Sequence, residues 1–117
     1  MKPNIIIEKS FLFAEQIVLS YKTLIYSKKE FILSKQLLRA GTSVGANVSE
    51  AVFGQSKKDF ISKLSIARKE ANETLYWINL LHRTGFLDSN ESQRLIESCE
   101  ELLRILSAII KSTLPKS

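Results

Sequence analysis

Basic side chains recur between residues 56 and 84 at a spacing that suits binding to a polyanion. This segment holds six basic and three acidic residues, a net charge of +3. On a helix, which turns by about 100° per residue, the cations Lys58, Lys69 and Arg83 fall within about 40° of one another, with Tyr76 among them. We call these four residues the basic stripe. Cations spaced in this way displace counterions from phosphates, which favours nucleic-acid binding without sequence specificity.

A second, shorter line of cations precedes the basic stripe along the chain. It consists of Lys28, Lys35 and Arg39, which we expect on one side of the second helix. The whole chain carries a net charge of +5, from 17 basic and 12 acidic residues. Acidic residues are interspersed among the cations, so the alternative of a hydrated face that only keeps the protein in solution stays open.

The residue types that commonly carry catalysis do not form a set in this sequence. His82 is the only histidine, and one imidazole makes neither a metal site nor a pair of nucleophile and base. Glu70 and Glu73 lie one helical turn apart, but nothing apolar or acidic nearby would raise the pKa of either. We expect them to form salt bridges with Lys63, Lys69 or a neighbouring subunit. The sequence therefore predicts a protein that is not an enzyme and needs no cofactor or metal.

Apolar periodicity and capping residues predict four helices, over about residues 5–26, 27–53, 56–85 and 89–114. The last three begin with a Ser or Asp followed three residues later by an acid: Ser27 and Glu30, Ser56 and Asp59, Asp88 and Glu91. Three short connections force neighbouring helices to run antiparallel. The predicted fold is all-α, a single domain of residues 1–117 that forms an antiparallel up-down-up-down four-helix bundle.

One apolar face of each predicted helix is expected to form the core. In the first helix this face is Phe11, Ala14, Val18, Tyr21 and Ile25. The faces of the other three helices include Leu37, Val44 and Val48, then Leu64, Ala71 and Ile78, and finally Leu95, Leu102 and Leu106. The only cysteine, Cys99, lies in phase with the last set, so we expect a buried thiol without redox chemistry.

The third helix has a second apolar side, made of Ile66, Trp77 and Leu80, roughly opposite its core face. Large apolar groups on an outer face are typical of protein interfaces, and tryptophan is enriched at their centres. The sequence therefore predicts that these residues form a homo-oligomer interface. The alternative is that Trp77 packs under the first helix or the N-terminal segment.

The stretch from Gln36 to Val52 combines a helical apolar period with residues that disfavour a helix. Gly41 and Gly45 each destabilise a helix interior by roughly 1 kcal/mol relative to alanine, so packing must compensate. We expect a continuous helix whose glycines admit a neighbouring helix at close range, and the alternative is a loop between two short helices. Asn47 can hydrogen-bond across this contact and fix the register of the two helices.

The motif RAGTSVGANVSEA (Arg39 to Ala51), followed by SKKDFISKLSIARKEANETLYWINLL (Ser56 to Leu81), resembles a known family. It is similar to the four-helix-bundle proteins encoded in intervening sequences of bacterial 23S rRNA genes, which are also classed with ribosomal proteins. The resemblance extends from about Asn4 to Leu87. It implies no established enzymatic activity. Its relatives include an accessory protein of diversity-generating retroelements, which implies a pentameric ring that binds nucleic acid and a protein partner.

Two classes of function remain open. One is a homo-oligomer, expected to be a pentamer, that binds RNA or other nucleic acid without base specificity. The other is a protein-interaction scaffold whose partner supplies the activity. No apolar run approaches the roughly 18 residues of a membrane span, and three isoleucines near the N-terminus are too few for an export signal. We therefore expect a cytoplasmic protein with no membrane contact.

Overall fold

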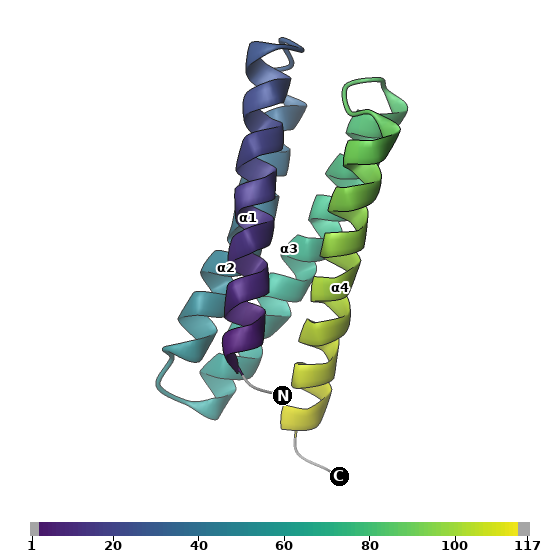
Figure 1. Cartoon of the computed structure of the whole chain (residues 1–117). Coiled ribbons are helices and arrows are strands. Elements are labelled where there is room, and N and C mark those ends of the chain that lie inside the picture. Colours follow the sequence, from purple (N-terminus) through teal and green to yellow (C-terminus); the bar gives the residue numbers. More distant parts are fainter. Residues whose placement is uncertain (1–2, 115–117) are drawn as a thin grey trace.

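The computed structural model describes residues 3–114, which form four α-helices and no strand. Their bounds are Pro3–Tyr26 for α1, Leu33–Val52 for α2, Lys57–Arg83 for α3 and Ser89–Thr113 for α4. Successive helices run in opposite directions, so the turns after α1 and α3 lie at one end and the turn after α2 at the other (Figure 1). The domain is an elongated bundle of about 48 × 21 × 19 Å. The predicted antiparallel four-helix bundle is confirmed.

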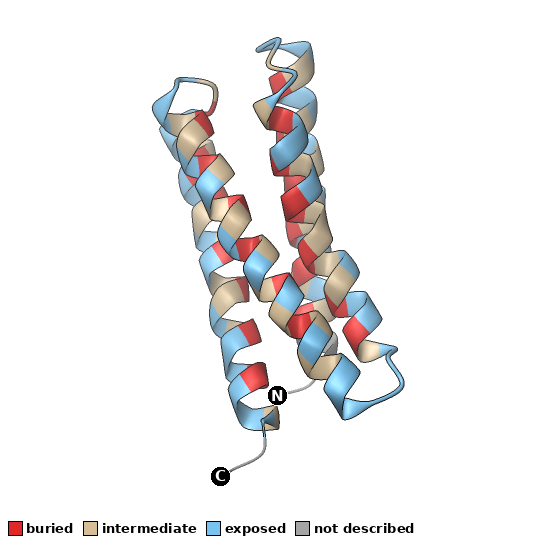
Figure 2. Cartoon of the chain, turned by 180° about the vertical axis from the view of Figure 1, so that it is seen from behind, coloured by how far each residue is buried: buried red, intermediate tan, exposed pale blue. Residues whose placement is uncertain are grey.

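The core lies along the inner faces of the helices, each of which packs against two neighbours in the order α1, α2, α3, α4 and back to α1 (Figure 2). The faces predicted for α2, α3 and α4 are the buried ones. Cys99 is fully buried, and its Sγ lies 3.2 Å from the Ala71 carbonyl oxygen, to which it donates. Burial raises the pKa of this thiol to about 12. The prediction of a buried thiol is confirmed.

The face predicted for the first helix is wrong by about one residue. The buried side chains of α1 are Ile6, Ser10, Phe13, Ile17, Ser20 and Leu24, whereas Phe11 is 66% exposed. Because α1 is apolar around most of its circumference, its periodicity does not single out one face. Two serines lie on the buried face, and Ser20 is held there by a 2.7 Å hydrogen bond that its Oγ donates to Glu91.

The start of α2 also differs from the prediction. The helix begins at Leu33 rather than Ser27, and its N-terminus is capped by the Glu30 carboxylate. This carboxylate accepts hydrogen bonds from the backbone N–H groups of Ile32, Leu33 and Ser34, at 3.2, 3.1 and 2.6 Å. Burial alone would raise the pKa of Glu30, but these three hydrogen bonds outweigh it and lower the pKa below its ordinary value. Glu30 therefore serves as the cap that the sequence assigned to Ser27.

Substitution of Glu30 by glutamine is expected to destabilise the fold by about 1 kcal/mol at neutral pH, as loss of a helix cap does. The folded-state pKa is lowered, so the stabilisation is complete above the unfolded pKa of about 4.5 and is lost as pH falls through the lower folded value. Urea denaturation at a series of pH values checks both effects. Glu100→Gln, an exposed position in α4, is the control and should change neither. If the free energy of unfolding of the Glu30→Gln variant fell with decreasing pH as that of the parent does, Glu30 would not be the cap of α2.

Candidate nucleic-acid surface

The basic stripe lies along the outer side of α3. Ser56 starts this helix by accepting a 3.0 Å hydrogen bond from the backbone N–H of Asp59. Lys58, Lys69 and Arg83 are exposed, and within residues 3–114 none of the three takes part in an ion pair. At a rise of 1.5 Å per residue, the stripe extends over roughly 37 Å. These cations are therefore available to an external anion along most of the helix.

Tyr76 presents its ring within the basic stripe. The ring is 60% exposed and meets Trp77 edge to face, with centroids 4.9 Å apart and planes at 80°. The edge-to-face contact supports the ring from one side and leaves much of it open to solvent. An exposed aromatic ring among cations can stack on a base while the cations contact phosphates.

The second line of cations does not form as predicted. Lys28 lies in the turn before α2, outside the helix. The Arg39 guanidinium donates to Glu70, at 3.3 Å, and to Glu73, so two carboxylates of α3 already neutralise its charge. Only Lys35 remains on α2 as an exposed cation without an ion pair among residues 3–114. The line therefore reduces to one free cation on α2 and one in the preceding turn.

Glu73 joins α2 to α3 and also holds Trp77. Its carboxylate accepts from the Trp77 Nε1–H at 3.0 Å and from Arg39. The Trp77 hydrogen bond and the Arg39 charge hold the pKa of Glu73 below its ordinary value, although desolvation acts in the opposite direction. The prediction that Glu70 and Glu73 form salt bridges is confirmed, but their ion-pair partner is Arg39. Lys63 instead pairs with Glu50 at 3.2 Å, and the Lys69 charge also helps to lower the pKa of Glu73. This network is an interhelical contact between α2 and α3.

The outer apolar side of α3 is less exposed than the sequence indicated. Ile66 is 39% exposed, while Trp77 and Leu80 are half-buried, and Trp77 packs against the core. The larger exposed apolar surface lies on α1, where Phe11 and Leu19 are both more than half exposed. This surface did not follow from the sequence, because the apolar face predicted for the first helix includes Phe11 among the core residues.

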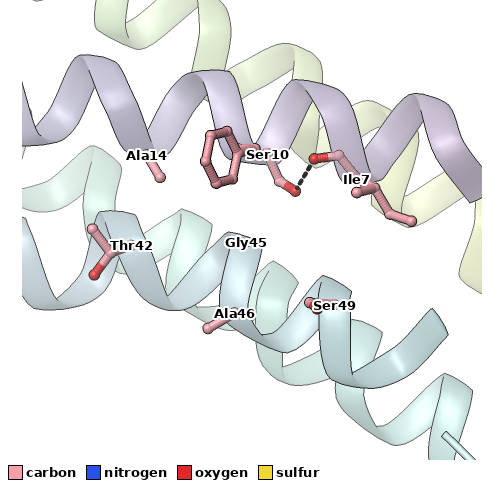
Figure 3. A pocket seen from close by; sticks show the side chains of 8 residues that line it. Ile7, Ser10, Ala14, Thr42, Gly45, Ala46 and Ser49 are labelled. Carbon is pink, nitrogen blue, oxygen red and sulfur yellow. Dashed lines mark hydrogen bonds between the residues drawn. The ribbon is translucent and has the colours of Figure 1, made fainter. Parts of the chain in front are cut away.

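The exposed apolar surface of α1 contains two adjoining hollows. Together we call them the α1–α2 groove. The first has a volume of about 350 Å³ and lies between α1 and α2, and Figure 3 shows its lining residues: Ile7, Ser10, Phe11, Ala14, Thr42, Gly45, Ala46 and Ser49. The second, of about 370 Å³, continues along α1 and is lined by Phe11, Ala14, Glu15, Val18 and Leu19. Phe11 belongs to both hollows. The groove is shallow and almost entirely apolar or small in its side chains.

The two glycines of α2 face α1 at close range. The helix continues through both, so the prediction of one continuous element is confirmed. A Cβ at Gly41 would lie 2.7 Å from Cγ1 of Ile17, and a Cβ at Gly45 would lie 3.2 Å from the Ser10 carbonyl oxygen. The prediction for Asn47 is wrong, because its Nδ2 donates to the Ser43 carbonyl oxygen of its own helix at 2.9 Å. The backbone contact at the glycines, rather than the Asn47 amide, brings the helices together.

Other kinds of site find little support in the described residues. Residues 3–114 contain no group of three or more His, Cys, Asp or Glu side chains that could bind a metal ion. His82 lies at the end of α3 with its Nε2 3.3 Å from Ser89 Oγ. None of the four helices in this part of the chain combines the length and the apolar character that crossing a membrane requires.

Comparison with known proteins identifies a family and solved structures similar to this chain. The family of 23S rRNA-intervening sequence proteins matches residues 2–108. A crystal structure of a protein with unknown function from the S23 ribosomal protein family of Bacteroides thetaiotaomicron is 49% identical to this chain. The match covers 95% of this chain and 99% of the other, with a TM-score of 0.93. No curated protein matches the chain.

Proposed function

The chain belongs to the 23S rRNA-intervening sequence protein family, and we propose that it is a cytoplasmic, non-enzymatic protein that binds RNA as a homo-oligomer. The observation that carries this proposal is the basic stripe, in which Lys58, Lys69 and Arg83 are exposed and unpaired within residues 3–114. Binding of this kind reads the phosphate backbone and carries little information about base sequence.

Stabilisation of the fold and solubility explain these three cations less well than phosphate binding does. Cations that stabilise the fold are expected to pair with acids, as Arg39 does with Glu70 and Lys63 does with Glu50. Within the described residues the stripe cations make no such pair, and an unpaired cation displaces counterions from a phosphate at little cost. The exposed Tyr76 ring adds a stacking surface that a purely solubilising face does not need.

The homo-oligomer part of the proposal rests on exposed apolar surface. The α1–α2 groove and the partly exposed Ile66 of α3 give the subunit two apolar areas on different helices. Head-to-tail contact between two different areas generates a closed ring when the rotation between subunits permits it. The number five comes from the family resemblance alone. A ring would also repeat the basic stripe around one axis, so weak phosphate contacts would act together.

Replacing Lys58, Lys69 and Arg83 together with glutamine is expected to weaken RNA binding and to flatten its salt dependence. Each phosphate contact contributes about 0.7 to 0.9 to the slope of log affinity against log salt, so losing three contacts lowers its magnitude by roughly two units. Filter binding with an unrelated RNA, over a series of salt concentrations, measures both quantities. The fold should remain intact, because all three side chains are exposed.

The matched control removes the same charge from another helix. Arg94, Arg104 and Lys111 are exposed cations of α4, and none forms an ion pair within the described part of the chain. Their triple glutamine variant should keep the parent's slope. Equal losses in the two triple variants would mean that overall charge, and not the stripe, governs binding. A parent protein with no salt-dependent RNA affinity would refute the proposed function.

A protein-interaction scaffold is the second candidate, and the α1–α2 groove is the observation that favours it. An exposed apolar groove lined by small residues can accept an amphipathic helix of another protein. Such binding buries apolar area and responds little to salt, whereas phosphate binding weakens steeply with salt. Capture of one defined protein at high salt, lost on substitution of Phe11, would favour the scaffold over the RNA-binding protein.

A further inference from the structure

The turn between α1 and α2 presents apolar and basic side chains together at one end of the bundle. Tyr26, Phe31 and Ile32 are 70%, 53% and 75% exposed, although soluble proteins usually cover side chains of this size. Lys28 and Lys29 are exposed in the same turn. We call residues 26–32 the α1–α2 tip.

Hydrogen bonds hold the α1–α2 tip in one conformation. The backbone N–H groups of Ser27 and Lys28 donate to the Thr23 carbonyl at 2.9 and 3.2 Å, and that of Glu30 donates to Leu24 at 2.9 Å. The Glu30 carboxylate then fixes the start of α2 through its three backbone hydrogen bonds. The exposed side chains are therefore held outward by a pre-formed turn, and a ligand would not have to order a loop to use them.

The charge around the α1–α2 tip is strongly positive. Residues 22–35 contain four lysines and one acid, a net charge of +3. The one acid is Glu30, whose carboxylate is occupied by backbone N–H groups. Lys22 and Lys35 extend the basic character onto the two helices beside the tip, and both are exposed. A polyanion fits this charge, and the apolar side chains require a polyanion that also carries exposed flat or apolar groups.

We propose that the α1–α2 tip binds unpaired nucleotides of RNA, with bases stacked on Tyr26 and Phe31 and phosphates beside Lys28 and Lys29. This inference rests on the proposed function and specifies its ligand. In duplex RNA the bases are stacked inside the helix and cannot reach an aromatic side chain, whereas loops, bulges and ends expose them. The tip lies at the same end of the bundle as Arg83, where the basic stripe ends (Figure 1).

The test removes the rings and leaves every charge in place. Binding of the Tyr26→Leu, Phe31→Leu variant to oligo(U) and to a blunt RNA duplex of equal length is measured by fluorescence anisotropy. Each lost stacking contact lowers affinity by roughly tenfold, so binding to oligo(U) should fall by at least that factor. Affinity for the duplex and the salt slope should stay the same, because no cation is removed. The leucines keep apolar bulk, so a loss reports on the rings themselves.

Two further variants make the result decisive. Phe31→Tyr keeps a ring at that position and should retain the parent's affinity. Phe53→Leu changes an exposed aromatic ring in the turn at the opposite end of the bundle, and it should leave binding to both probes unchanged. Thermal melting of each variant should match the parent, because the substituted side chains are exposed.

The outcomes that would overturn the inference are distinct from those that refute RNA binding itself. Unchanged oligo(U) affinity in the leucine variant, with a loss in the stripe variant, removes the tip proposal and leaves the proposed function intact. An equal loss for oligo(U) and duplex would also overturn it. Binding of the parent to vesicles containing phosphatidylglycerol, lost in the leucine variant while oligo(U) affinity stays unchanged, would assign the tip to an anionic membrane surface instead.

Discussion

Replacing Gly41 with leucine should lower the free energy of unfolding by about 3 kcal/mol, although leucine is the better helix former. The gain in helix propensity is at most about 1 kcal/mol. The first added carbon would lie 2.7, 2.9 and 3.0 Å from three carbons of Ile17, a β-branched side chain that is fully buried between the helices. Since the Ile17 side chain is fully buried and branched at Cβ, it adjusts poorly, and the overpacking should outweigh the propensity. Urea denaturation followed by circular dichroism measures the difference.

The same contact can be isolated by a pair of smaller substitutions. Ile17→Ala removes the atoms that a Cβ at position 41 would meet, so Gly41→Ala should be less harmful, or even stabilising, in that background. Ala108→Leu adds an alkyl chain at an exposed position of α4 and should have little effect. A Gly41→Leu protein that melts at or above the temperature of the parent would show that α1 can move away freely, contrary to the close contact described.

Substitution of Phe11 by glutamate should convert the proposed homo-oligomer into monomers. Phe11 belongs to both hollows of the α1–α2 groove, and a glutamate there would place an unpaired charge in the proposed contact. The association constant should fall by roughly a hundredfold or more. Trp77 is a poorer position for this test, because its indole N–H is bonded to Glu73 and a glutamate there would disturb the subunit itself. Light scattering at micromolar concentration measures the change in mass.

Phe53→Glu is the matched control for this experiment. It introduces the same charge at another exposed phenylalanine, in the turn after α2, and should leave the assembly intact. RNA affinity should fall in Phe11→Glu even though no cation is lost, because a monomer no longer combines several stripes. A parent protein that is itself a monomer, or a Phe11→Glu variant that remains assembled, would contradict the proposed interface.

The sequence was sufficient for the fold because the core face is recognisable in three of the four helices, and two of these three begin at the predicted capping residue. Leu64, Leu95 and their neighbours are buried where the period of 3.6 residues placed them. It failed for α1, whose apolar residues surround the helix, so that only its contacts with α2 decide which side is inside. The predicted helix start at Ser27 was also wrong. The Glu30 carboxylate accepts from backbone N–H groups two to four residues ahead, and the Ser-x-x-Glu capping pattern does not describe this arrangement.

The candidate surface was predictable only where it depends on one helix. Lys58, Lys69, Tyr76 and Arg83 share a helical face, and spacing alone determines that. The pairing of Arg39 with Glu70 depends on how far α2 is shifted along α3, which spacing within either helix does not reveal. The α1–α2 tip did not follow from the sequence either, because Phe31 and Ile32 lie in a turn, whereas the capping pattern predicted a helix from Ser27 onward.

The glycines of α2 influence which side of α1 is exposed to solvent. A helix such as α1, which is apolar on more than one side, can pack in a bundle with either side facing the core. A neighbouring helix with a smooth surface would not distinguish between the two orientations. Ile17 occupies the space beside Gly41, and the backbone at Ser10 lies against Gly45. A turn of α1 by one residue would bring the much larger Phe11 toward the narrow place at Gly45 that Ser10 now occupies. The close contact at Gly45 thus favours one rotation of α1, and in that rotation Phe11 and Leu19 face outward.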